Sequence, residues 1–208
     1  DVSTSMLAED LKPNRLEAAK DVAAEFINGR PNDNIGITLF AGETFTQCPL
    51  TVDHAVLLDM IHNIKCGLIT DGTAVGMGIA NAVTRLKDSK AKSKVIILLT
   101  DGTNNKGDIS PMTAAEIAKS FGIRVYTIGV GTNGMAPYPY PVGNTVQYVS
   151  MPVEIDEKTL TEIAGTTDGN YFRATSNSKL KEVYEEIDKL EKTKLNVKEY
   201  SKRDEEYH

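Results

Sequence analysis

The sequence predicts a doubly wound α/β fold, in which helices cover both faces of a mostly parallel central sheet with one antiparallel edge strand. Two short runs, Lys94–Thr100 (KVIILLT) and Ile123–Val130 (IRVYTIGV), are almost continuously apolar and rich in β-branched residues, as strands buried on both faces are. Segments with the apolar period of a helix alternate with such runs. A tight turn at residues 41–43 joins two further strand-like runs, and so short a connection makes that pair antiparallel.

The individual elements follow from apolar periodicity and from capping signals. Asn14 and Arg15, behind Pro13, mark a later start within the first helical pattern, and Ser110 is expected to cap the helix that Pro111 begins. Helices are predicted over residues 10–29, 53–64, 73–86, 111–121, 158–164 and 178–193, and strands over 34–40, 44–47, 94–100, 123–130 and, at an edge, 170–173.

Residues 134–152 are predicted to be an irregular insertion, because prolines alternate with tyrosines from Pro137 to Pro141. For residues 137–141 the favoured interpretation is a rigid, polyproline-like loop that covers the sheet edge, and the alternative is a partner contact. Residues 129–134 match the G-x-G-x-x-G pattern, but that fingerprint requires a helix to begin there. The Pro-rich residues that follow cannot form one, so nucleotide binding is not expected.

Length and composition indicate one globular domain. The chain has 208 residues, of which 40% are hydrophobic and 25% charged. Its net charge is −6 without a basic cluster, so no nucleic-acid partner is expected. We predict a single domain over residues 1–194 and a tail over 195–208 that leads out of it. The strand that should feed Asp1 is expected to be truncated.

Cys48 and Cys66 are predicted to be free thiols. Counting strand directions places Cys48 at the bottom of the sheet and Cys66 at the top, with the helix over residues 53–64 between them. Twelve helical residues span about 18 Å, whereas a disulfide needs Cα atoms within about 7 Å.

One edge of the predicted sheet collects hydroxyl and carboxylate side chains. Asp1, Ser3 and Ser5 open the chain, Thr73 follows a loop that starts at the same edge, and Asp101 follows a central strand. Ligands of such sheets bind beyond the carboxyl ends of the strands, and oxygen ligands suit Mg²⁺. Another carboxylate in the Thr73 loop, Asp71, is either an orienting residue of this site or a turn former.

The motifs DVSTS (residues 1–5), DGT (71–73) and LLTDG (98–102) together resemble the von Willebrand factor A domain with its metal-ion-dependent adhesion site. The resemblance implies a Rossmann-like A-domain fold. It also implies that Ser3, Ser5 and Thr73 offer hydroxyls to a divalent cation, with Asp1 and Asp101 acting directly or through water. Mg²⁺ is the first expectation, with Mn²⁺ or Ca²⁺ as alternatives. Neutral hydroxyls leave the cation electron-poor, so that it can take a carboxylate from a partner.

Further stretches resemble the bacterial Bat aerotolerance proteins (BatA and BatB): RLEAAKDVAAEFI, DGTAVGMGIANAVTRLK, GVGTNGMAPYP and EIAGTTDGNYFRATSNSKLKEVYEEIDKLEK. This resemblance implies a membrane-tethered bacterial interaction module, on the periplasmic side, that is anchored through segments outside this chain. It implies a protein partner that presents Asp or Glu, with other A-domain proteins or a MoxR-type ATPase system as candidates.

Two other functions remain open from the sequence, a metal-dependent hydrolase and a structural scaffold with an empty site. Hydrolysis needs a base beside the metal. The sequence contains no Gly-x-Ser-x-Gly elbow and no paired-carboxylate acid/base set. We therefore expect a protein that is not an enzyme.

Overall fold

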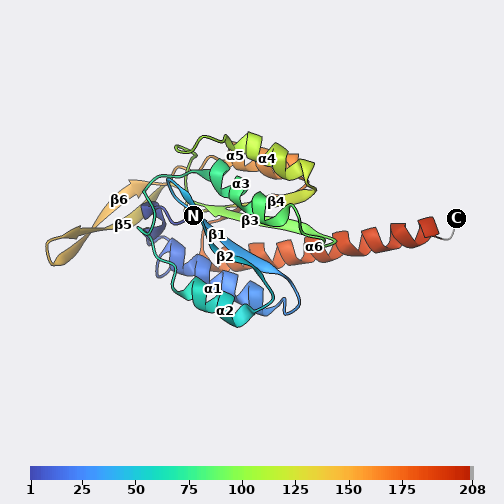
Figure 1. The fold of residues 1–208 in the computed structure, drawn as a ribbon. Helices are drawn as coiled ribbons and strands as arrows, with labels where there is room; N and C mark the ends of the chain where they lie inside the picture. The colour runs from blue at the N-terminus through green and yellow to red at the C-terminus, as the bar shows by residue number, and fades with distance from the viewer. Residues whose placement is uncertain (207–208) are drawn as a thin grey trace.

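The structure, a computed structural model, describes residues 1–206, and the side chains of residues 1–195 (Figure 1). The elements are η1 (Thr4–Leu7, a 3₁₀ helix), α1 (Arg15–Asn28), β1 (Ile35–Phe40), β2 (Thr44–Thr51), α2 (His54–His62), α3 (Val75–Leu86), β3 (Lys94–Thr100), α4 (Pro111–Ser120), β4 (Ile123–Val130), β5 (Met135–Val142), β6 (Thr145–Pro152), α5 (Glu157–Thr166), β7 (Tyr171–Ala174) and α6 (Asn177–Glu206).

The predicted α/β fold is confirmed. Strands β3, β4 and β7 form a parallel sheet in that order, with β7 at an edge, and β1 and β2 form an antiparallel pair. Helices α3, α4 and α5 cover one face, whereas α1, α2 and α6 cover the other (Figure 1). Alternation along β4 explains both layers, because Val125 packs with the first helix group and Tyr126 with the second.

Local capping follows the sequence signals. The side chain of Asn14 accepts a hydrogen bond from the backbone N–H of Glu17 and caps α1. Ser110 caps α4 in the same way, and Pro111 occupies the first turn. Strand β2 is longer than predicted, because Pro49 lies in an edge strand, where a missing N–H is tolerated.

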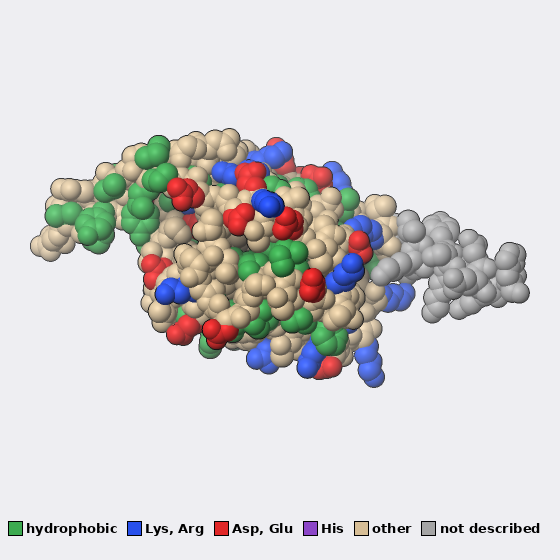
Figure 2. Space-filling view, turned by 90° about the horizontal axis from the view of Figure 1, so that it is seen from above, with side chains coloured by type: hydrophobic (Ala, Val, Ile, Leu, Met, Phe, Trp, Pro, Cys, Tyr) green, Lys and Arg blue, Asp and Glu red, His purple; other side chains and the backbone are tan. Residues whose placement is uncertain are grey.

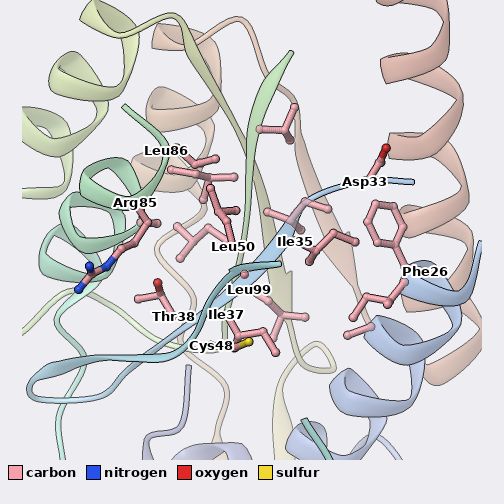
Figure 3. Close-up of a pocket in the computed structure, with 18 of the residues that line it drawn as sticks. Phe26, Asp33, Ile35, Ile37, Thr38, Cys48, Leu50, Arg85, Leu86 and Leu99 are labelled. Carbon is pink, nitrogen blue, oxygen red and sulfur yellow. The ribbon is translucent and has the colours of Figure 1, made fainter. Parts of the chain in front are cut away.

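Residues 1 and 2 bridge the two sheets. The nitrogen of Asp1 donates to the carbonyl of Leu99 in β3 (3.1 Å), and the N–H of Val2 donates to the carbonyl of Phe40 in β1 (2.8 Å). Next to this bridge lies a cavity of about 810 Å³. Its lining includes Phe26 of α1, Ile37 of β1, Leu86 of α3 and Leu99 of β3 (Figure 3). The truncated first strand stays a prediction.

The prediction for residues 134–152 is wrong, because they form the antiparallel β5–β6 hairpin, which projects from the body instead of covering the sheet edge (Figure 1). The carbonyl of Pro137 accepts from the N–H of Glu9 and so points away from β6. Pro139 and Pro141 share its orientation, since residues two apart in a strand face the same way. None of the three therefore removes a hydrogen bond from the β5–β6 ladder.

The final helix continues beyond its predicted end, because α6 extends through residue 206 and includes most of the predicted tail. The domain boundary at residue 194 stays a prediction. The two cysteines are free, as predicted, since Cys48 pairs with Ile37 within the β1–β2 sheet, whereas the Cys66 thiol lies by the carbonyl of Ser3.

Candidate metal centre

Two chain segments that are far apart in sequence meet directly at the edge of the sheet where the parallel strands end (the upper edge below). The Ser5 hydroxyl donates to Oδ1 of Asp101 over 2.8 Å, and the hydroxyls of Ser3 and Ser5 lie 2.9 Å apart. Ser3 and Asp101 are buried. η1 supplies Ser5, and Asp101 directly follows β3, so direction counting from the sequence correctly predicted this juxtaposition.

Asp1 is held from two sides. Its Oδ1 accepts from the backbone N–H of Ser3 over 2.9 Å, which closes the first turn of the loop. Its Oδ2 accepts from the hydroxyl of Thr100 over 2.6 Å. Sequence reasoning missed Thr100 because it read this buried residue as the end of a strand only.

Thr73 comes from the loop before α3 and is also buried. Its backbone N–H donates to Oδ1 of Asn105 over 2.9 Å, which ties this loop to the one after β3. A Cβ added to Gly102 would lie 3.4 Å from the Thr73 hydroxyl oxygen, so this hydroxyl is beside the residue that follows Asp101. Among the described residues the hydroxyl has no hydrogen-bond partner, and its lone pairs remain available.

Asp71 contacts Thr4, which separates Ser3 from Ser5. Its two carboxylate oxygens accept from the N–H and the hydroxyl of Thr4 over 3.1 and 2.9 Å. Burial raises the pKa of Asp71, but the bonds from Thr4 and Gly72 outweigh it and lower the pKa overall. A residue that orients the metal site would make these contacts, so an orienting role for Asp71 stays a prediction.

Arg15 is the main residue that sequence reasoning missed. Its Nη1 donates to Oδ2 of Asp101 over 2.7 Å. Its Nε and Nη2 donate to Oδ1 and Oδ2 of Asp10 over 2.7 and 2.6 Å. All three side chains are at most 4% exposed. Burial lowers the pKa of Arg15, but the two carboxylates raise it above its usual value. The sequence did contain a signal for Arg15. A helix N-terminus disfavours positive charge, so a basic residue in the first turn of α1 indicates a partner that compensates for it.

The glycine-rich loop after β4 contacts both Asp10 and Arg15 of this buried ion cluster. The N–H of Thr132 donates to Oδ2 of Asp10 over 2.8 Å. Gly131 has φ +143°, and a Cβ there would lie 3.0 Å from Nη2 of Arg15. The G-x-G-x-x-G pattern therefore reflects close packing on Arg15 here.

The donor set fits a hard divalent cation. Because the Ser5 proton points at Asp101, Ser3 donates to Ser5, which leaves one lone pair of Ser5 and both of Ser3 free, and the Thr73 hydroxyl is unused. Among the described residues no group of three or more His, Cys, Asp or Glu could hold a metal, so a cation at this edge depends on hydroxyl oxygens. Ser3, Ser5 and Thr73 would hold it, with Asp1 and Asp101 in reach directly or through water.

Comparisons with known proteins agree with this fold. The model of the von Willebrand factor type A domain matches residues 1–186. The crystal structure of BatB from Bacteroides thetaiotaomicron is similar at 34% identity and TM-score 0.79, with 92% of this chain and 96% of that one covered. An aerotolerance-related membrane protein from Bacteroides fragilis is similar at 32% identity and TM-score 0.78, with 91% and 94% covered.

Two further similar proteins are longer than this chain. A mussel byssus protein, proximal thread matrix protein 1, described with a zinc-occupied MIDAS motif, shares the fold at 23% identity and TM-score 0.67, with 91% of this chain and 47% of that one covered. A UPF0353 protein of Nocardia farcinica is 32% identical over 90% of this chain. The chain spans 60% of that relative's length. The match over residues 1–186, together with the architecture, shows that this chain belongs to the von Willebrand factor type A domain family.

Proposed function

We propose that this chain is a metal-dependent protein-interaction module that binds a carboxylate of a partner protein through a divalent cation. The observation that carries the proposal is the linked set of Ser3, Ser5 and Asp101, with the unused hydroxyl of Thr73 beside it. A-domain relatives are generally interaction modules, which supports the same role.

The chain's own residues prepare such a site. Asp1 binds the backbone of Ser3, and Asp71 binds Thr4 between Ser3 and Ser5, so both serines are fixed before any ligand arrives. Arg15 balances the charge of Asp101 within the protein, which leaves fewer negative charges facing a partner. A bound cation would supply an electrophilic position for a carboxylate oxygen. Mg²⁺ is our first proposal, ahead of Mn²⁺ and Ca²⁺.

The setting of the module is also proposed from its relatives. The Bacteroides fragilis relative is described as a membrane protein, and we propose that this chain belongs to a membrane-tethered bacterial protein facing the periplasm. Its partners would be proteins that present Asp or Glu, with A-domain proteins or a MoxR-type ATPase system as candidates. None of the helices in the described part of the chain combines the length and apolarity needed to cross a bilayer.

Hydrolysis is the weaker alternative. Asp101 is engaged by Arg15 and Ser5, while Asp1 is engaged by Ser3 and Thr100. The oxygens of both carboxylates are occupied by these bonds, so neither is placed to take a proton from a water molecule. We therefore propose that the protein is not an enzyme.

Calorimetric titration with Mg²⁺ and Mn²⁺ tests the metal site. The wild type is expected to bind, Asp101→Ala to lose binding, and Asp108→Ala, an exposed control in the same loop, to bind normally. Circular dichroism verifies that each variant is folded. A pulldown from membranes with and without EDTA then tests the partner, which should be retained by the wild type only when metal is present. Equal metal affinity in Asp101→Ala would contradict the proposal.

A further inference from the structure

The β5–β6 hairpin is mostly exposed. Every residue of β6 is exposed, and large apolar side chains stand free on it, including Val146, Tyr148, Val149 and Met151. Figure 2 shows these apolar side chains gathered on the projecting arm. Residues 135–152 contain no Asp, Glu, Lys or Arg, although a quarter of the whole chain is charged. Such a surface is typical of an interaction site.

The two outer edges of this hairpin differ in hydrogen-bonding capacity. On β5 the outward positions are Pro137, Pro139 and Pro141, which have no N–H, and the N–H of Glu9 already occupies the Pro137 carbonyl. Proline on an outward edge prevents strand addition. The outer edge of β5 is therefore closed to a further strand.

The outer edge of β6 is open. Val146, Tyr148 and Ser150 lie directly opposite the three prolines, so their N–H and C=O groups point away from β5. In the part of the chain that the structure describes, β6 pairs with no strand other than β5. The β6 edge thus presents outward N–H donors as well as C=O acceptors, whereas the three prolines of β5 offer no donor.

We propose that this edge pairs with the same edge of a second copy of the chain, to give an antiparallel four-stranded sheet across a two-fold axis at Tyr148. In that register Val146 lies opposite Ser150 of the other copy, and Tyr148 lies opposite its own counterpart. All these residues are outward-facing, so each pair exchanges both N–H···O bonds. The register thus uses the outward N–H and C=O groups of Val146, Tyr148 and Ser150.

Charge and shape favour a second copy as the occupant. An uncharged edge meets its own copy without repulsion, whereas the rest of the chain carries a net charge of −6. Because the hairpin projects from the body, its edge can be reached without contact between the two bodies (Figure 1). Self-pairing through one patch also gives the closed two-fold symmetry that is commonest among oligomers.

Sedimentation from micromolar to millimolar concentration tests the proposal in its simplest form. The wild type is expected to form a concentration-dependent dimer, in EDTA as well as in Mg²⁺, since no candidate metal ligand lies on the hairpin. The result for the dimer is therefore independent of the result for the proposed metal site. A chain that stays monomeric throughout, whether or not it binds peptides or lipid vesicles, would overturn the proposal.

A charge-reversal pair tests the register. Val146→Lys with Ser150→Lys places like charges opposite each other across the axis, so the dimer dissociation constant should rise by about tenfold. Val146→Lys with Ser150→Glu places opposite charges there, and dimerisation should be retained. Within one chain both positions face prolines, so the two variants are matched in fold. Equal behaviour of the two variants would exclude this edge.

Ser150→Pro removes an outward N–H without breaking the ladder to β5, as Pro137, Pro139 and Pro141 already do on the opposite strand. This variant is expected to be folded by circular dichroism and to dimerise more weakly than the wild type. Unchanged dimerisation would show that the contact lies elsewhere, for example at the unpaired inner edges of β1 and β3.

Discussion

The candidate metal centre and the β5–β6 hairpin occupy the same end of the molecule, but they invert the usual distribution of side chains. At the centre, charged residues are buried, with Arg15 at 4% and Asp101 at 3% exposed. On the hairpin, apolar side chains are exposed, with Tyr148 at 59% and Val146 at 57%. A buried charge costs free energy unless it is paired, and an exposed apolar patch gains little for folding. The fold therefore stabilises the first region and leaves the second available for contacts.

The comparison predicts that the largest change in stability follows from substitution of Arg15. Arg15→Met would leave Asp10 and Asp101 buried without a counter-charge, so the free energy of unfolding should fall by about 3–5 kcal/mol. Urea-induced unfolding measures this change. The matched control is Arg85→Met, because Arg85 is exposed and should change stability by less than about 0.5 kcal/mol. Similar losses in the two variants would mean that the buried cluster does not stabilise the fold.

Metal binding should give the next largest effect. At a Mg²⁺ concentration of 100 times the dissociation constant, the wild type should gain about 2.7 kcal/mol of stability. Thr73→Val keeps the size of the side chain but removes the unused hydroxyl, so much of this gain should be lost. Unfolding with and without Mg²⁺ measures the difference. A full gain in Thr73→Val would remove Thr73 from the ligand set.

Acid should weaken the centre through Asp10. Burial raises the pKa of Asp10, but Arg15 and the N–H of Thr132 lower it overall below 3.8. The unfolded chain therefore binds the proton more readily, and the stabilisation by Asp10 is complete above pH 3.8 and is lost as the pH falls through the folded pKa. The stability difference between wild type and Asp10→Asn, from urea titrations at several pH values, should shrink only in that acidic range. A difference that shrinks near neutrality would contradict this.

The hairpin should give the smallest effect on folding. Tyr148→Phe removes only the exposed bond from its hydroxyl to Glu9 (3.1 Å), so the free energy of unfolding should change by less than about 1 kcal/mol. Thermal unfolding measures it, and Mg²⁺ affinity should be unchanged. A larger loss would show that the hairpin is part of the cooperative core.

The sequence by itself determined the helices, the central strands and the set of residues that meet at the upper sheet edge. Apolar periodicity is local, and strand direction can be counted along the chain, so Ser5 and Asp101 could be placed together although 96 positions separate them. The Asn14 and Ser110 caps were equally local signals.

Only the tertiary structure decided which residue neutralises the charge of Asp101 at that sheet edge. It also decided which strand of the hairpin has an open outer edge. The bond from Arg15 to Asp101 joins groups on different elements, and no spacing rule specifies such a partner. The meaning of Pro137, Pro139 and Pro141 depends on which way each nitrogen faces, and that is known only once β6 lies beside β5. Proline breaks a ladder when it faces the paired strand and protects an edge when it faces outward.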